Sequence, residues 1–441
     1  MSATVNILHL SDIHFSHKVA GGTYDLDADV RNEVERDLGV VFSELRAACT
    51  GIVVTGDIAY AGKTEDYRVA SDWLTHVAGL TGCRPENIWV TPGNHDIDRD
   101  DVRASELLKD MHRTLRSTRG PDLDNKLRKY LEDKVAAPAL FSPLRQYLAF
   151  AGRFQCEVGP VKPYWEQDLP LNDGSTLRLR GLTSVLTSDD SDDDRASRLV
   201  LGAAQTTLLR HEGVEYMTLC HHPPDWLVDQ EEADTALTAR ARIQLFGHKH
   251  SHRIDRINDS LRIAAGAMHP EREGHNWQPR FNVVRVSVDA GGPHRSLKVE
   301  VLPRVWDPNL RQFVADRGTP GGDDRRVYML PLGAWSPAPV AASATPQTSA
   351  PAVNPDSSRG DSMDPLRRLT YRFLSLPYHV RIEIAGRLDL LADEDKDTSD
   401  ADLFRRVFRR ASERGRLGAL WTETERKQKD SDTGANPFIN D

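Results

Sequence analysis

The chain has 441 residues and is 39% hydrophobic, which is enough for one large core and a second, smaller domain. It contains no run of about 18 or more apolar residues, and its N-terminus enters a strand-like pattern without a basic leader, so we expect a cytoplasmic protein that does not span a membrane. The net charge of -9 argues against general nucleic-acid binding, and the four scattered cysteines indicate neither a disulfide framework nor a thiolate zinc site.

Residues 5–303 alternate short apolar runs with longer polar segments that suit helices, which is typical of an α/β domain. The first five strand-like runs are VNILHL, GIVVT, NIWVT, EYMTLC and IQLF. The later runs LRIAAGA, FNVVRVSV and LKVEVLP follow closely, with the turn signal DAGG between the last two. They predict a second, more antiparallel sheet packed face to face with the first, in a domain that we assign to residues 1–334.

A charged helical pattern interrupts this domain at residues 99–150 and is too long for a plain loop, so we predict an inserted helical cap. Arg99, Arg103 and the basic run at residues 112–119 are available there to contact an anionic group such as a phosphate, although a charged helix face usually lies in solvent. Further along, the acidic run DDSDDD at residues 189–194 lacks the spacing of a calcium loop and predicts a solvated loop.

Beyond this domain, residues 335–362 are rich in Ala, Pro, Ser and Thr and predict a flexible linker. A small domain of three or four helices is predicted for residues 363–429, with Asp364 as N-cap and Pro365 at the first helical position, and a polar tail for residues 430–441. This layout resembles that of bacterial defence and signalling effectors joined to helical interaction domains. We therefore predict that the small domain binds a protein partner.

The segment LFRRVFRR of the small domain is amphipathic. Its apolar face carries Leu403, Phe404, Val407, Phe408 and Ala411, and its basic face carries Arg405, Arg406, Arg409 and Arg410. Such a helix can bind a membrane surface or nucleic acid. The near balance of charge over the whole segment instead favours a packed helix with its arginines in solvent.

Each of the first five strand-like runs ends in residue types that ligate metal ions. These residues are Asp12 and His14, then Asp57, then Asn94, His95 and Asp96, then His221 and His222, and finally His248 and His250. One alone would be interpreted as a turn former or a core residue, but five such groups at strand ends, where ligands collect in α/β sheets, favour a metal site. Carboxylates, imidazoles and an amide without thiolates suit Mn²⁺, Fe or Zn²⁺.

A tetrahedral ion takes four ligands, so seven of these side chains are too many for one such ion. They suit two ions bridged by a shared carboxylate, for which Asp57 is the candidate. Two ions about 3.5–4 Å apart would supply a bridging hydroxide at neutral pH. We therefore expect two divalent ions as cofactors, with Mn²⁺ ahead of Fe and Zn²⁺.

The motifs SDIH, GDIAYAG, GNHD, HHPP and GHKH, in this order, resemble those of the calcineurin-like metallophosphoesterases. The resemblance implies a four-layer α/β sandwich of two mixed sheets flanked by helices. It implies that one metal is held by Asp12, His14, Asp57 and His250, and the second by Asp57, Asn94, His221 and His248. It also implies that His95 faces the substrate and protonates the leaving oxygen as a general acid. Asp96 would orient the ring of His95, or else only cap the turn.

The superfamily resemblance leaves the substrate open. Protein phosphatases of the superfamily continue Gly-Asp into Val-Asp-Arg-Gly, and the phosphate-binding arginine of that stretch has no counterpart here. The stretches GDIAYAG and PGNHD are closer to the bacterial cyclic-nucleotide phosphodiesterases. We predict a phosphodiester hydrolase acting on cyclic nucleotides or similar small phosphodiesters. A metal-dependent DNA or RNA nuclease is the alternative, and a non-catalytic scaffold protein is the second alternative.

Three further residues beside the ligand motifs, His222, Lys249 and His252, are predicted to contact the substrate or to support the ligands. Residues 268–280 would help to form the rim of the site, with Trp277 available to stack on a base. A loop aromatic is more often simply packed, so the two interpretations of Trp277 stay open.

Overall fold

The computed structural model describes residues 4–18, 25, 27–192, 198–268, 278–290, 294–318, 321–336, 365–395, 398 and 400–428. The chain divides into two compact units, Met1–Ala334 and Trp335–Asp441, and each is described by itself. Most of the predicted linker and all of the predicted polar tail lie outside the described residues. Of the helices in the described ranges, none combines the length and the apolarity that crossing a bilayer requires.

The first unit contains two mixed sheets. The larger sheet has the order β12-β11-β10-β1-β2-β3, and β13 also pairs with β11. Its strands are β1 (Val5–Leu10), β2 (Gly51–Thr55), β3 (Ile88–Thr91), β10 (Arg280–Asp289), β11 (Ser296–Asp307), β12 (Gln312–Ala315) and β13 (Arg326–Pro331). Strands β1, β2 and β3 run parallel, whereas β10 runs antiparallel to β1 and to β11. Every residue of β1 and β2 is buried, as expected for strands covered on both faces.

The second sheet has the order β4-β5-β6-β7-β9-β8. Its strands are β4 (Tyr164–Pro170), β5 (Thr176–Leu182), β6 (Val214–Cys220), β7 (Ala241–Phe246), β8 (Arg253–Ile257) and β9 (Ser260–Ala264). Strands β5, β6, β7 and β9 run parallel, and β4 and β8 close the two edges in the antiparallel sense. The indole of Trp165 in β4 donates to the Val90 carbonyl of β3 at 2.8 Å and so links the two sheets.

The predicted grouping of the last three strand-like runs was wrong. The run at 261–267 supplies β9, which is parallel to β7 in the second sheet, whereas the other two runs supply β10 and β11 of the first sheet. Sequence periodicity identifies a strand but carries no information on its partner, because pairing is set by contacts between distant segments. The expectation of two mixed sheets flanked by helices is confirmed.

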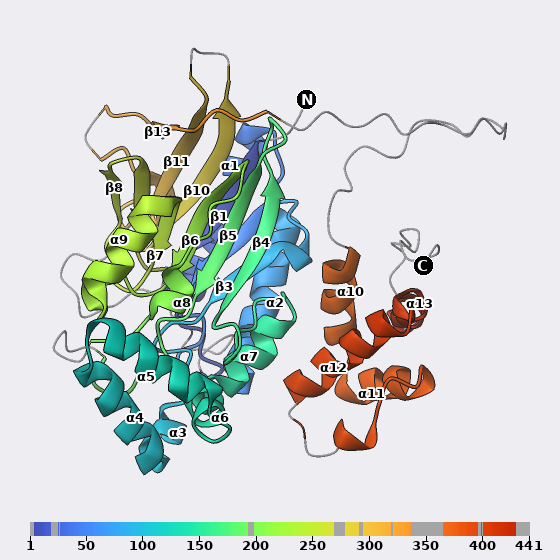
Figure 1. Cartoon of the computed structure of the whole chain (residues 1–441). Helices are drawn as coiled ribbons and strands as arrows, with labels where there is room; N and C mark the ends of the chain where they lie inside the picture. The colour runs from blue at the N-terminus through green and yellow to red at the C-terminus, as the bar shows by residue number, and fades with distance from the viewer. Residues whose placement is uncertain are drawn as a thin grey trace. The chain divides into compact units, whose positions relative to one another are not determined.

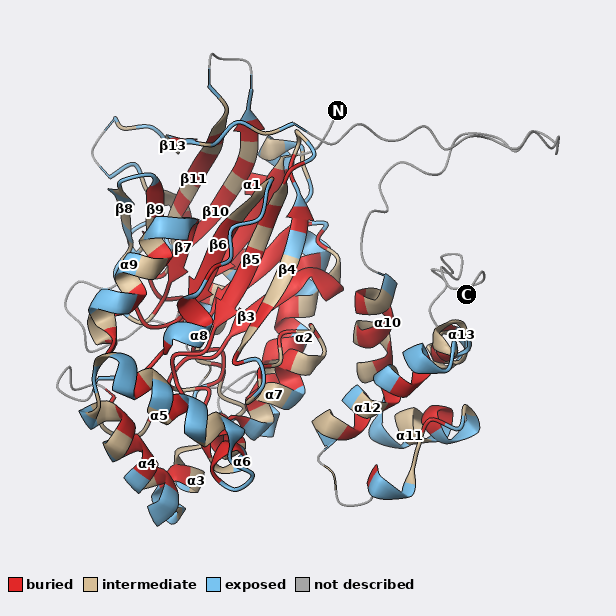
Figure 2. Cartoon of the chain, in the orientation of Figure 1, coloured by how far each residue is buried: buried red, intermediate tan, exposed pale blue. Residues whose placement is uncertain are grey.

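Helices cover the outer faces of the two sheets (Figure 1). Outside the insertion they are α1 (Ala28–Leu45), α2 (Thr64–Leu80), α8 (Ala203–Thr206) and α9 (Gln230–Arg240), with short 3₁₀ turns at Pro85–Asn87 and Pro224–Trp226. Helix α1 packs against β12 and α2, and α9 packs against β6 and β7. Figure 2 shows the strands between these helices as largely buried, so the core lies in and between the sheets.

The helical insertion follows the loop after β3 and gathers at one end of the sheets (Figure 1). It consists of α3 (Arg99–Ala104), α4 (Glu106–Ser117), α5 (Gly120–Glu132), α6 (Ala136–Phe141), a 3₁₀ turn at Ser142–Leu144 and α7 (Arg145–Gly152). Helix α4 begins where the Ser105 hydroxyl accepts a hydrogen bond from the Leu108 amide at 3.3 Å. Its apolar stripe, which includes Met111 and Leu115, is buried against the rest of the insertion.

The described part of the acidic run is only partly solvated, whereas the prediction was a solvated loop: Asp190 is exposed, but the run is tied to the insertion by ion pairs. Arg116 of α4 donates to Asp189 at 2.8 Å, and Arg103 of α3 donates to Asp190 at 2.6 Å. Asp192 is buried and lies 3.3 Å from Arg116. The acidic run therefore fastens the insertion to the second half of the domain. Its partners lie more than 70 residues away in the chain, so no local pattern reveals them.

The second unit is a small helical bundle. Its helices are α10 (Pro365–Leu374), α11 (Tyr378–Arg387), α12 (Asp400–Glu413) and α13 (Leu417–Lys427), with a 3₁₀ turn at Asp393–Asp395. Its core contains Leu369, Phe373, Ile384, Leu390, Leu403, Phe404, Val407, Leu420 and Trp421. Asp364, the predicted N-cap, lies outside the described residues.

One arginine of α12 does not lie in solvent as predicted. Arg410 is buried, and its guanidinium donates to both oxygens of Asp395, at 2.5 and 3.0 Å, and to the Leu390 carbonyl at 2.9 Å. The hydrogen bond from Arg410 lowers the pKa of Asp395 to about 2. The pair therefore joins α12 to the 3₁₀ turn inside the bundle.

Substitution Arg410→Ala is expected to destabilise the helical bundle by about 2 kcal/mol, because it removes the buried guanidinium that donates to both oxygens of Asp395 and leaves this carboxylate with Arg406 at 3.3 Å. Hydrogen exchange of α10 to α13 in the full-length chain measures this change. The matched control is Arg409→Ala, since Arg409 is 62% exposed and its ion-pair partner among the described residues is Glu413, one helical turn away. It is expected to cost less than about 0.5 kcal/mol. Equal exchange rates in both variants would contradict a stabilising role of the buried pair.

Candidate metal centre

The predicted ligands follow five strands of two sheets. Asp12 and His14 follow β1, Asp57 follows β2, and Asn94 follows β3, all in the first sheet. His221 follows β6, and His248 and His250 follow β7, in the second sheet. The strands within each set are parallel, so their carboxyl ends open at one edge. The structure brings these side chains together there, in overlapping groups whose ligating atoms lie within 4.8 Å of one another.

The backbone at these positions is in an unusual conformation. Of the ten non-glycine residues with positive φ in the described part of the chain, five are predicted ligands. They are Asp12 (φ 52°), His14 (φ 53°), Asp57 (φ 52°), His248 (φ 67°) and His250 (φ 51°). This left-handed region is unfavourable for residues with a Cβ and is tolerated where the surrounding structure enforces it, typically at functional sites. The strained backbone positions therefore lie in the same loops as the ligand motifs.

The first ligand group consists of Asp12, His14 and His250. One carboxylate oxygen of Asp12, Oδ2, accepts the backbone N–H of His248 at 3.2 Å. The other, Oδ1, is buried, accepts no hydrogen bond that meets the usual geometry from the described residues, and faces Nε2 of His250 at 3.3 Å. Two atoms that both ligate metals, held face to face in a buried site, fit a divalent cation between them.

Asp57 lies between the two ligand groups. Its Oδ2 atom is 3.7 Å from Nε2 of His14 and 3.3 Å from Nε2 of His221. Its Oδ1 atom accepts the backbone N–H of His95 at 2.8 Å. The side chain is only 2% exposed and can reach ligands on both sides, which is the position a bridging carboxylate needs.

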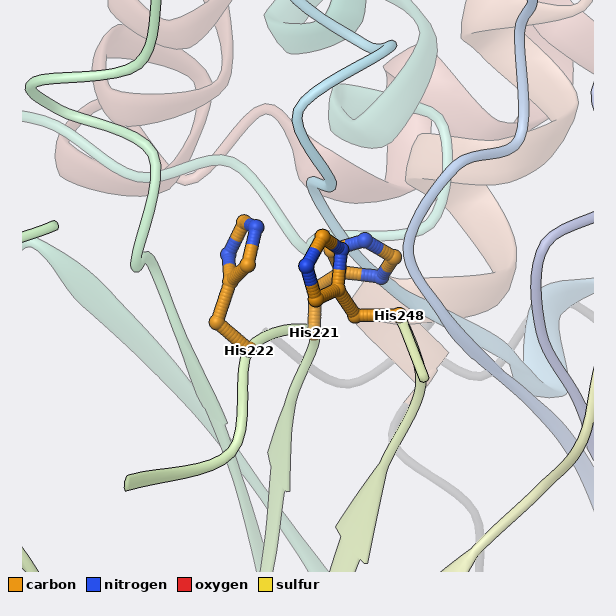
Figure 3. A group of neighbouring side chains, drawn as sticks. All are labelled: His221, His222 and His248. Atoms are coloured by element: carbon orange, nitrogen blue, oxygen red, sulfur yellow. The ribbon is translucent and has the colours of Figure 1, made fainter. Parts of the chain in front are cut away.

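The second ligand group consists of His221, His222 and His248 (Figure 3). The Nδ1 atom of His221 donates to the Thr55 carbonyl at 2.7 Å, which leaves Nε2 free to bind a metal. Asn94 joins this group, because its Oδ1 atom lies 3.1 Å from Nε2 of His221 and 3.2 Å from Nε2 of His222.

His222 lies within this ligand group, whereas the sequence predicted that it contacts the substrate or supports the ligands. Its Nδ1 atom lies 2.8 Å from the Ser184 hydroxyl, which orients the ring.

Trp226 was not singled out from the sequence, yet the centre of its ring lies 4.1 Å from the centre of the His248 ring. The only signal for Trp226 is its position shortly after the HHPP motif.

The electrostatics of the site suit cation ligands. Burial alone would raise the pKa of Asp57, but the charges of His221 and His95 hold this pKa well below its usual value. Burial and the charge of His221 lower the pKa of His248 to about 3, so its ring is neutral and available to a metal at neutral pH. Burial opposes protonation of His221, but the charge of Asp57 raises the pKa of His221 to about 9. The site thus attracts positive charge, and its donor set fits divalent ions.

His95 lies beside this centre, with its ring 4.6 Å from that of His14. Its Nδ1 atom donates to the Tyr60 carbonyl at 2.9 Å. Of the two roles that the sequence left open for Asp96, the structure shows the turn cap, since the Gly93 amide donates to its carboxylate, and not a contact with the His95 ring. Its carboxylate accepts the backbone N–H groups of Ile58, Ala59 and Gly93 and the Tyr67 hydroxyl.

Asp96 therefore holds together the loops that follow β2 and β3. Burial, and then the charge of Asp57, raise the pKa of Asp96 to about 6. The orienting group for His95 is a backbone carbonyl, and a backbone carbonyl leaves no residue-type signal in the sequence.

The other two predicted substrate contacts face carboxylates. Lys249 donates to Asp225 at 2.6 Å. His252 is buried, with a ring nitrogen 3.8 Å from the Asp316 carboxylate. Trp277 and most of residues 268–280 lie outside the described residues.

Comparison with known families gives two matches in separate parts of the chain. Residues 5–252, more than half of the chain, match the calcineurin-like phosphoesterase model. The chain therefore belongs to the calcineurin-like phosphoesterase family, which confirms the resemblance drawn from its motifs. Residues 365–426 match the GTPase-associated adaptor domain. Among curated proteins, none matches this chain.

Solved structures similar to this chain are distant in sequence. Vps29 from Entamoeba histolytica complexed with Zn²⁺ is 10% identical, with a TM-score of 0.27 over 74% of this chain and 99% of that chain. A putative 5′-nucleotidase from Staphylococcus aureus is 13% identical, with a TM-score of 0.33 over 65% and 51% of the two chains. A predicted phosphoesterase from Streptococcus pneumoniae TIGR4 is 12% identical, with a TM-score of 0.27 over 74% and 98%.

Proposed function

We propose that this chain is a phosphodiester hydrolase that works with two divalent metal ions, Mn²⁺ ahead of Fe or Zn²⁺. One ion would be held by Asp12, His14, Asp57 and His250, and the other by Asp57, Asn94, His221 and His248. The position of Asp57 between the two ligand groups, with contacts to His14 and His221, is the observation that carries the proposal. When bound, such ions polarise a phosphoryl group and activate the attacking water.

The proposed role of His95 is to protonate the leaving oxygen. Because a carbonyl oxygen only accepts, the Nδ1–H of His95 is fixed on the Tyr60 carbonyl. The Nε2 atom is then the one that remains for the substrate. In the protonated ring this atom carries the proton that the leaving alkoxide requires. Asp96 supports the reaction indirectly, because it holds the loops that carry Asp57 and His95.

The substrates that we propose are cyclic nucleotides or similar small phosphodiesters, with a DNA or RNA strand as the second candidate. A hollow beside His95 favours the second candidate, because one of its lining cations, Arg99, has no ion pair among the described residues. The match to an adaptor domain supports a recruiting role for the helical bundle, with a protein as its partner.

Substitution His95→Ala is expected to lower turnover by about 100-fold and to leave the metal content unchanged, because His95 transfers a proton but is not among the proposed ligands. The measurement is turnover with Mn²⁺ on bis-p-nitrophenyl phosphate, cyclic nucleotides, and single- and double-stranded DNA, beside metal analysis of each protein. The control is His76→Ala, since His76 is exposed on α2 and contacts Glu35.

The outcomes separate the candidate functions. The best substrate of the wild type identifies its subclass. A wild-type protein that binds stoichiometric metal but hydrolyses none of these substrates would contradict the phosphodiesterase proposal. A protein that neither holds metal nor gains thermal stability from Mn²⁺ would favour the scaffold alternative.

A further inference from the structure

A small hollow lies directly beside His95. It has a volume of about 190 Å³ and is lined by the loop after β2, the loop after β3 and the start of α3. Its lining residues are Tyr60, Ala61, Lys63, His95, Ile97, Asp98, Arg99, Asp100 and Arg103. It adjoins the face on which His95 would meet a leaving group.

Two of the three cations in this hollow are already neutralised. Lys63 donates to Asp98 at 2.7 Å and to Asp100 at 3.1 Å. Arg103 donates to Asp190 at 2.6 Å and to Asp100 at 2.9 Å. Neither can take up a ligand without breaking an existing ion pair.

Arg99 is different from these two cations. Among the described residues it makes no hydrogen bond and no ion pair, and its Nη2 atom is buried without an acceptor. The pKa of Asp190 is lowered first by the hydrogen bond from Arg103, and the charge of Arg99 adds to this effect from a distance. A buried guanidinium N–H without an acceptor is unfavourable, and an anion bound in the hollow would supply the acceptor. Because no ion pair holds Arg99, its side chain can turn towards an anion in the hollow.

The proposed role of His95 as general acid determines which part of a substrate lies in this hollow. A general acid must lie against the leaving oxygen, so the group attached to that oxygen lies on the side of His95. The ring of Tyr60 also lines the hollow, is 54% exposed and lies 5.8 Å from the ring of His95. It offers a flat surface to the sugar or base of a leaving nucleotide.

We propose that this hollow binds the leaving group of a linear, oligonucleotide-type phosphodiester and that Arg99 contacts a second phosphate on that group. The inference rests on the proposed function and narrows its substrate class. A cyclic nucleotide carries no second phosphate, so it cannot use Arg99 in this way. A strand of nucleic acid or a phosphorylated dinucleotide can, because its next phosphate lies one nucleotide beyond the scissile bond.

The experiment compares three thymidine dinucleotides with the Mn²⁺-loaded full-length protein. One has no terminal phosphate, one has a 5′-phosphate and one has a 3′-phosphate. The wild type is expected to prefer one of the phosphorylated dinucleotides in kcat/KM by about tenfold, the size of one charge-assisted contact. Arg99→Ala is expected to abolish this preference, and Arg99→Lys to retain part of it. Because each preference is a ratio within one protein sample, it does not depend on the fraction of folded protein.

The control is Arg113→Ala, since the Arg113 side chain is 73% exposed on α4 and, in the part of the chain that the structure describes, pairs with Asp110. This variant is expected to keep the wild-type preference. Equal preference in Arg99→Ala and wild type, or no preference in the wild type, would overturn the inference. Turnover of cyclic nucleotides or bis-p-nitrophenyl phosphate, but of no dinucleotide, would overturn it while leaving the proposed function standing. No turnover of any substrate by a metal-loaded wild type would count against the proposed function itself.

Discussion

Substitution Asp57→Ala is expected to weaken binding of divalent metal by more than about 100-fold and to reduce turnover to background. Loss of a group that only supports a ligand already costs about 10–100-fold in metal affinity or activity, so loss of a shared ligand costs more. Asp57 also accepts the backbone N–H of His95, so its removal frees the loop that carries the proposed acid. Both the metals and the proton donor are therefore affected by this one change.

Metal analysis and thermal unfolding test this expectation without relying on turnover. The wild type is expected to gain thermal stability on addition of Mn²⁺, because an ion that binds only the folded state stabilises it, and Asp57→Ala is expected to lose that gain. The matched control is Asp72→Ala, since Asp72 is an exposed carboxylate on α2 that lies 3.7 Å from Arg68. An Asp57→Ala protein with the full metal content of the wild type would exclude Asp57 as the bridging ligand.

The clustering of the candidate metal ligands is the part of the structure that the sequence predicts best. Motifs with metal-ligating residue types are visible after the strands Val5–Leu10, Gly51–Thr55 and Ala241–Phe246. Parallel strands of one sheet bring their carboxyl ends to the same edge, so these residues are expected to meet there. The strand partners of Arg280–Asp289 were not predictable in the same way. That strand pairs with a segment nearly 280 residues earlier, and no local pattern carries this information.

Contacts between distant segments also explain the errors at single residues. Arg410 has the spacing of a solvent-facing arginine on its helix, but its position beside the core and the distant carboxylate of Asp395 keep it buried. Asp96 follows His95 in the chain, yet its carboxylate turns away to backbone amides, and the Tyr60 carbonyl holds the ring instead. In each case the residue type was visible in the sequence but its partner was not.

Substitution Gly93→Ala is expected to lower turnover by more than about 100-fold and to reduce metal binding, although it adds only one methyl group. A Cβ atom at position 93 would lie 2.2 Å from Oδ1 and 2.4 Å from the backbone nitrogen of Asp57, well inside van der Waals contact. The Gly93 amide donates to Asp96 at 2.9 Å, so the loop is not free to move aside. Displacement of a reacting or ligating group by about 1 Å typically costs about 100-fold in rate.

The control for this prediction is Gly39→Ala, in the middle of α1, where a Cβ atom would meet nothing within 4 Å. Alanine is the better helix former, so this variant is expected to raise the free energy of unfolding by up to about 1 kcal/mol and to keep full activity. Urea unfolding, metal analysis and turnover of both variants separate a local effect on Asp57 from a general loss of stability. If Gly93→Ala kept wild-type turnover and metal content, close contact between the loops after β2 and β3 would not be needed to position Asp57. The site would then tolerate a shift of the Asp57 carboxylate. This result would contradict the proposal that Asp57 is shared between two ions, because a shared ligand has to keep its position.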